Sequence, residues 1–92
     1  MSKKRDRLEI IRDILLAVRE KRGKVRPTHI LYKSNLSHQS LTEYLRELLL
    51  KEFLIETEDV KGKKTYDLTD KGFKFLEEYS VIQGFIDSYG LQ

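Results

Sequence analysis

The 92-residue sequence has no cysteine, which excludes disulfide bonds, thiolate catalysis and cysteine-based zinc sites. It has no apolar run long enough to span a membrane. A basic start is followed by apolar positions that Glu9, Arg12 and Asp13 interrupt, so the continuous apolar region of a signal peptide is missing. We therefore expect a soluble intracellular protein without a membrane partner.

The residue patterns of catalysis and metal binding are also missing. The two histidines, His29 and His38, join no close metal-ligand pattern. Asp59, Asp67 and Asp70 fall at predicted strand ends and at a helix cap, where structural roles explain them. No nucleophile–base pair, phosphate loop or paired acid site is present. We predict a protein that is not an enzyme and that uses no cofactor, metal ion or small-molecule substrate.

Charge, in contrast, is abundant: charged residues make up 36% of the chain, against about a quarter in typical globular domains. The net charge of +3 is unevenly distributed, because residues 1–26 contain ten Lys/Arg and four Asp/Glu, whereas residues 27–92 contain eight and eleven. A basic segment favours a polyanionic partner through counterion release. Solvated helix ends explain the same charges equally well.

Apolar spacing predicts three helices in the first half of the chain. Over residues 5–21, apolar residues recur at three- and four-residue intervals. Pro27 suits the first turn of a short second helix, which Asn35 ends. Ser37 can cap a third helix. The buried stripe of that third helix is expected to consist of Leu41, Leu45, Leu48 and Leu49.

The second half of the chain predicts a β-hairpin and a last helix. The stretches "FLIETEDV" and "KTYDLT" alternate in polarity, and the basic turn between them contains Gly62, which permits a positive φ. Thr69 or Asp70 then caps the last helix. Three helices, a hairpin and a helix predict an α+β, mainly helical fold, the winged helix-turn-helix, in which the hairpin is the wing.

Three stretches resemble a known family: "KKRDRLEIIRDILLA", "PTHILYKSNLS" and "KGKKTYDLTDKGFKFLEEY". They resemble archaeal winged-helix DNA-binding proteins, most nearly the small ten-kilodalton ("ten-a") chromatin proteins of thermophilic archaea, and the similarity covers essentially the whole chain. The resemblance implies a homodimer joined by an antiparallel C-terminal coiled coil, with two winged heads that bind double-stranded DNA. It also implies a cytoplasmic, nucleoid-associated protein.

The last helix indicates a partner chain independently of this resemblance. Its apolar residues are spaced four, three, four and three apart, which is a heptad seam over about two repeats. A helix over residues 70–89 is about 30 Å long, too long to bury every apolar residue on a small head. The alternative is that this helix folds back on its own head. We expect a head of residues 1–69 and a dimerisation helix of residues 70–92, with the seam formed by Phe75, Tyr79, Ile82, Ile86 and Tyr89.

The winged-helix arrangement indicates which residues face DNA. The N-terminal residues of the third helix reach base edges in the major groove, and a basic wing tip contacts phosphates. The basic N-terminus can act as a flexible arm, and the start of the second helix can donate N–H groups to a phosphate. The predicted DNA-binding residues are His38, Gln39, Ser40, Thr42, Arg46, Lys61, Lys63, Lys64, Lys3, Lys4, Arg5, Arg26, Thr28 and Lys33. Tyr32 fits the core equally well.

Two acidic residues of the third helix, Glu43 and Glu47, repel phosphates unless they pair with Arg46 and Lys51. The leading hypothesis is a dimer that binds duplex DNA mainly through phosphates, for chromatin architecture or transcriptional regulation. The alternative is a protein-interaction winged helix that does not bind DNA, with Glu43 and Glu47 facing a partner protein.

Overall fold

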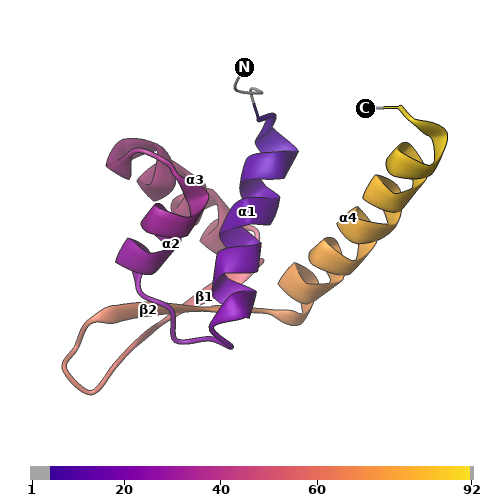
Figure 1. The fold of residues 1–92 in the computed structure, drawn as a ribbon. Helices are drawn as coiled ribbons and strands as arrows, with labels where there is room; N and C mark the ends of the chain where they lie inside the picture. Colours follow the sequence, from indigo (N-terminus) through magenta and orange to yellow (C-terminus); the bar gives the residue numbers. More distant parts are fainter. Residues whose placement is uncertain (1–4, 92) are drawn as a thin grey trace.

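The computed structural model describes residues 5–91. Its elements follow in the order α1 (Arg7–Glu20), α2 (Pro27–Ser34), α3 (His38–Leu50), β1 (Leu54–Glu58), β2 (Lys64–Leu68) and α4 (Asp70–Tyr89). The first three helices pack together, the hairpin extends to one side of them and α4 leaves on the other (Figure 1). This arrangement confirms the predicted winged helix-turn-helix with a long C-terminal helix.

Local capping explains where the helices begin. The predicted caps Ser37 and Thr69 are confirmed, since their hydroxyls accept hydrogen bonds from the N–H groups of Ser40 and Gly72, both at 3.1 Å. α1 begins later than expected, at Arg7, because Asp6 forms a capping box with Glu9. The Asp-x-x-Glu spacing before an apolar run is the sequence signal for that start.

The core lies between the three N-terminal helices and the base of the hairpin. Side chains from every element contribute to it: Ile11, Ile14, Leu15, Val18, Val25, Ile30, Leu41, Leu45, Leu48, Leu54, Tyr66 and Leu76. Leu49, which was predicted to be buried, is only partly buried at the edge of this core. The remaining predicted stripe of α3 is confirmed.

The wing is an antiparallel pair whose register runs from Leu54↔Leu68 to Glu58↔Lys64. On the other edge of β2, Val25 forms an isolated bridge with Tyr66, with N–H to O distances of 3.0 and 2.9 Å. The connection between α1 and α2 therefore attaches directly to the wing. This attachment fixes the base of the hairpin against the head.

The first turns of α4 belong to the head. Gly72 is buried, and a Cβ added there would lie 2.4 Å from the carbonyl oxygen of Phe53. Leu76 is in the core, and the rings of Phe53 and Phe75 meet edge to face with centroids 5.7 Å apart. Phe75, predicted as the first position of the dimer seam, therefore packs on its own head.

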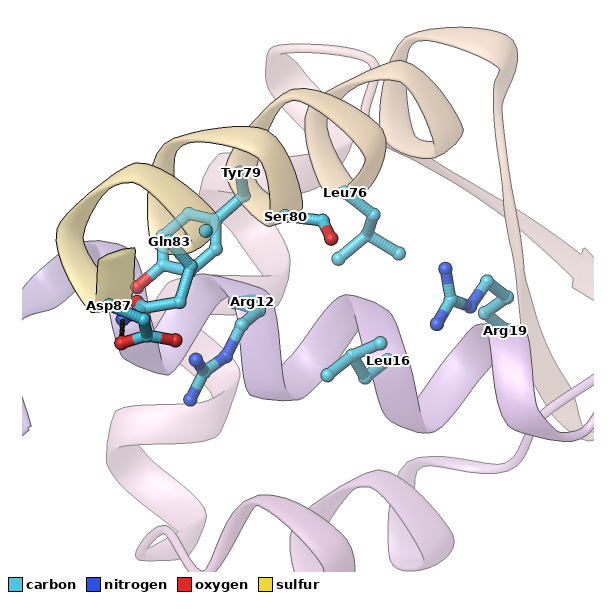
Figure 2. Close-up of a pocket in the computed structure, with 9 residues that line it drawn as sticks. Arg12, Leu16, Arg19, Leu76, Tyr79, Ser80, Gln83 and Asp87 are labelled. Atoms are coloured by element: carbon cyan, nitrogen blue, oxygen red, sulfur yellow. Dashed lines mark hydrogen bonds between the residues drawn. The ribbon is translucent and has the colours of Figure 1, made fainter. Parts of the chain in front are cut away.

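Tyr79, the second position of that seam, also contacts the head. Its ring lies 5.2 Å from the guanidinium carbon of Arg12 on α1. Figure 2 shows Arg12 beside Tyr79, and it shows Leu16 of α1 on the side of the groove opposite Leu76 of α4. The groove between α1 and α4 is therefore partly closed by contacts near the middle of α4.

Beyond Tyr79, α4 exposes four of its apolar side chains, whereas Ile86, a predicted seam residue, is partly buried. Val81, Ile82, Phe85 and Tyr89 are 59, 58, 61 and 72% exposed, respectively. The alternative in which the whole helix folds back on its own head is therefore wrong for this half. Among residues 5–91, no helix combines the length and the apolar character needed to cross a membrane.

Candidate nucleic-acid interface

A groove separates α3 from the wing and collects residues that are distant in the sequence. Its floor is apolar, with Leu31, Leu41, Leu45, Leu49 and Tyr66. Five predicted DNA-binding residues line it: Thr28 from α2, His38, Thr42 and Arg46 from α3, and Lys64 from β2. The helix-turn-helix and the wing thus present one continuous surface.

The polar residues at the start of α3 differ in what they can offer to a base edge. His38 and Gln39 are exposed, whereas Ser40 is only partly exposed. The Thr42 hydroxyl donates to the carbonyl oxygen of His38 at 2.9 Å, so its hydrogen is already used within the helix. The side chains whose donors remain available are therefore His38, Gln39, Arg46 and, less exposed, Ser40.

The two acidic residues of α3 have different environments. Glu47 pairs with Arg7 of α1 and with Lys51, whose Nζ lies 2.9 Å from Glu47 Oε2. The hydrogen bond from Lys51, followed by that from Arg7, lowers the pKa of the Glu47 carboxyl. Glu43 is exposed, and within residues 5–91 it has no ion pair, so the expected pair with Arg46 does not form.

Asp59 organises the wing tip. One carboxylate oxygen accepts hydrogen bonds from the N–H groups of Lys61 and Lys63, at 2.8 and 3.0 Å. The N–H of Gly62 donates to the Asp59 carbonyl oxygen at 2.9 Å, and Gly62 has the expected positive φ of +78°. The N–H of Lys63, then those of Lys61 and the charge of Arg26, hold the pKa of the Asp59 carboxyl below its usual range. The tip is therefore a closed, internally bonded loop.

The cations of this tip face solvent. Lys61, Lys63 and Lys64 are exposed, and none of them forms an ion pair with another residue of the part of the chain that the structure describes. Val60, at the apex beside them, is fully exposed. The tip thus carries three free positive charges on a rigid loop.

Three further predicted basic residues, Arg5, Arg26 and Lys33, form ion pairs with carboxylates of the same chain. Arg26 Nη2 lies 3.0 Å from Asp59 Oδ2, and Lys33 Nζ lies 3.2 Å from Glu20 Oε1 on α1. Arg5 pairs with Asp13 at 2.7 Å and also donates to the carbonyl oxygen of Asn35. The prediction that Arg5 belongs to a flexible basic arm is therefore wrong, because its side chain is bonded to α1 and to the end of α2. Lys3 and Lys4 lie outside the described residues.

One exposed residue was not singled out from the sequence. Tyr32, which was considered equally suited to the core, is 80% exposed on α2. Ile30, two positions earlier, is fully buried, and residues two apart lie on opposite sides of a helix. The helical spacing from Ile30 is the sequence signal that could have placed Tyr32 at the surface.

The histidines do not form a metal site. His38 lies at the α3 groove, whereas Nε2 of His29 is buried without a hydrogen-bond partner among the described residues. Within residues 5–91, no three His, Cys, Asp or Glu side chains are grouped so that they could hold a metal ion.

Comparisons with known proteins place this geometry in context. A protein of Methanocaldococcus jannaschii, described as uncharacterised, is 39% identical over 81 residues, which are 88% of this chain and 35% of that protein. The chain thus spans about a third of the length of this relative. MepR, a transcription regulator of a Staphylococcus aureus multidrug efflux pump, is 19% identical over 89% of this chain and 62% of its own, with a TM-score of 0.76, and shares the fold.

Sso10a-2, a DNA-binding protein from Sulfolobus solfataricus, is 25% identical. The similarity covers 94% of this chain and 90% of that one, with a TM-score of 0.74. This match confirms the resemblance to small archaeal winged-helix DNA-binding proteins. Residues 4–86 match the model of a family described as winged helix-turn-helix. The chain therefore belongs to the winged helix-turn-helix family.

Proposed function

We propose that this protein binds duplex DNA mainly through backbone phosphates, with α3 in the major groove and the wing along the adjacent backbone. The observation that carries the proposal is the set of free cations along one surface. Arg46 and Lys64 line the groove between α3 and the wing, and Lys61 and Lys63 continue this surface to the wing tip. The name of Sso10a-2, as a DNA-binding protein, supports the same function.

The balance of contacts favours binding with little sequence preference. Four cations that neutralise four phosphates predict a log–log salt slope of about −3.6 per head. With Arg46 on a phosphate, the side chains of α3 left to donate to base edges are His38, Gln39 and the partly exposed Ser40, and a Gln pairs with adenine. This balance favours chromatin architecture over regulation at a specific operator, and a nucleoid-associated, non-enzymatic role.

We also propose a homodimer through the C-terminal half of α4. Val81, Ile82, Phe85 and Tyr89 expose a continuous apolar surface on the helix, which favours burial against a second copy. Phe75 and Tyr79 already pack on the head, so the interface is displaced toward the C-terminus from the predicted seam. In this proposal residues 1–69 with the first turns of α4 form the head, and the rest of residues 70–92 dimerises.

The test is a titration against two unrelated duplexes of about 30 base pairs, at salt concentrations between about 50 and 200 mM. The mass of the complex is recorded in the same run. Equal affinities, a steep salt slope and two chains per complex are expected. Absence of binding to both duplexes at the lowest salt concentration contradicts the proposal.

One observation favours a second candidate function. Glu43 is exposed on α3 without a cation beside it in the described residues, and a carboxylate in that position opposes phosphates. A winged helix that binds a basic protein surface through α3 would use it directly. Glu43→Gln discriminates the two functions, because it should strengthen binding to DNA and weaken binding to a basic protein partner.

A further inference from the structure

A second group of free cations lies outside the α3 and wing surface. Arg19, Lys21, Arg22 and Lys24 surround the connection between α1 and α2, and we call them the turn cluster. All four are exposed, and within residues 5–91 none forms an ion pair. In contrast, six basic residues elsewhere are ion-paired: Arg5, Arg7, Arg12, Arg26, Lys33 and Lys51.

The backbone of the turn cluster has an unusual conformation. Arg22, Gly23 and Lys24 are consecutive residues at positive φ, of 59, 93 and 53°. Two non-glycine residues in this region are unfavourable and persist only where the surroundings hold them. The Lys24 N–H donates to Asp67 Oδ1 at 2.8 Å, and a Cβ on Gly23 would lie 1.8 Å from the same oxygen. The surrounding structure therefore holds this turn in one conformation.

The turn cluster lies beside the α3 groove but not in it. None of its four cations lines that groove, although Thr28 lines both the groove and the cavity that Lys21 and Lys24 border. Val25 pairs with Tyr66 on the edge of β2 opposite β1. Tyr66 lines the α3 groove, whereas its neighbour Asp67, which contacts the turn, points to the other face because side chains alternate along a strand. Figure 1 shows the connection from α1 to α2 below the base of the hairpin and apart from its tip.

Helix capping explains only part of this charge. Cations near the C-terminus of a helix interact favourably with its dipole, and Arg19 and Lys21 lie in the last turn of α1 and at its C-cap. Arg22 and Lys24 lie beyond the helix, where this effect has fallen off. Residues 19–24 contain four cations and one carboxylate, Glu20, which pairs with Lys33, and the carboxylate of Asp67 accepts a hydrogen bond from the turn backbone. The stretch therefore keeps a net positive charge that favours an anionic partner.

We propose that the turn cluster binds the phosphates of a second DNA segment while α3 and the wing hold the first. This inference rests on the proposed DNA binding and adds a second contact surface to each head. The fixed turn presents its cations without a cost for ordering the backbone, which suits phosphate contacts that carry no sequence information. Each head then connects two duplexes.

The experiment uses an immobilised duplex saturated with the full-length protein and measures capture of a second, labelled duplex. Arg22→Asn/Lys24→Asn removes two cations and keeps the turn, since Asn tolerates positive φ. Lys71→Gln/Lys74→Gln is the matched control, because it removes two exposed cations of α4 that form no ion pair within the described residues. We expect the first variant to reduce capture at least fivefold with less than a twofold change in affinity for one duplex of about 15 base pairs, and the control to capture like the wild type.

Three outcomes overturn the inference. If Arg22→Asn/Lys24→Asn captures the second duplex as the wild type does, the turn cluster is not a contact surface, and any bridging comes from the α3 surfaces. If capture and single-duplex affinity fall equally, the turn belongs to the first interface. If the wild type binds one duplex and captures no second one, the inference fails and the proposed function stands.

Discussion

Arg26 and Asp59, 33 residues apart in the sequence, form an ion pair with 3.0 Å between Nη2 and Oδ2. Arg26 is the N-cap residue of α2, and Asp59 closes the wing tip. The pair therefore joins the start of the helix-turn-helix to the loop that carries the free lysines. The wing is therefore held in place in the free protein, which lowers the ordering cost of the proposed DNA binding.

The wing tip should loosen at acidic pH. The pKa of the Asp59 carboxyl in the folded protein is lowered below its ordinary value of 3.8. The stability that the Asp59 carboxylate gives to the wing tip is therefore fully present above pH 3.8, and it is lost as the pH falls through the lowered pKa of the folded protein. In an NMR titration, the amide resonances of Lys61 and Lys63 should shift together, with a midpoint below 3.8. Asp59→Asn should abolish the shift. A midpoint at or above 3.8 contradicts the proposed hydrogen bonding.

Gly72→Ala should destabilise the head by about 1–3 kcal/mol, because the new Cβ would meet the Phe53 carbonyl oxygen at 2.4 Å. Urea unfolding measures the change. Gly84→Ala is the control within the same helix, where no atom lies within 4 Å of the added Cβ. It should stabilise α4 by up to about 1 kcal/mol. Equal effects of the two substitutions contradict the packing of α4 on the head.

Ile82→Ser/Phe85→Ser should convert the proposed dimer into monomers. Both side chains are more than half exposed on α4 and contribute little to the core of the head, so the variant should remain folded. Sedimentation equilibrium measures the mass, and circular dichroism measures the helix content. Leu50→Ser, at a residue 77% exposed on α3, is the control and should leave the mass unchanged. If the double variant is still a dimer, the dimer interface does not lie on this face of α4.

Lys61→Ala/Lys63→Ala/Lys64→Ala should weaken binding to every DNA sequence alike and reduce the salt slope by about 3 per head. The reason is that these side chains are free cations on a loop whose backbone is bonded internally, so their removal leaves the fold intact. Fluorescence anisotropy with two unrelated duplexes measures both quantities. Lys71→Gln/Lys74→Gln, which removes two exposed α4 cations without an ion pair among the described residues, serves as the control. If the salt slope of the triple variant equals that of the wild type, the wing lysines do not contact DNA.

Much of the architecture follows from short stretches of sequence. The caps Ser37 and Thr69, the left-handed Asn35 that ends α2 and the positive φ of Gly62 are local features, set by residues within a few positions of each other. The apolar spacing of α1 and α3 predicts the buried faces for the same reason. The type and order of the elements were therefore accessible without a structure.

The sequence by itself thus determined the winged-helix order of elements and the basic character of its first part, because both depend on composition and local periodicity. Only the tertiary structure decided which charges are free. Arg5, Arg26 and Lys33 are paired with Asp13, Asp59 and Glu20, whereas the turn cluster and the wing lysines are not. The tertiary structure also showed that Phe75 packs on the head, because its ring contacts the ring of Phe53. Ion pairs and ring contacts depend on distances between residues far apart along the chain, which periodicity does not encode.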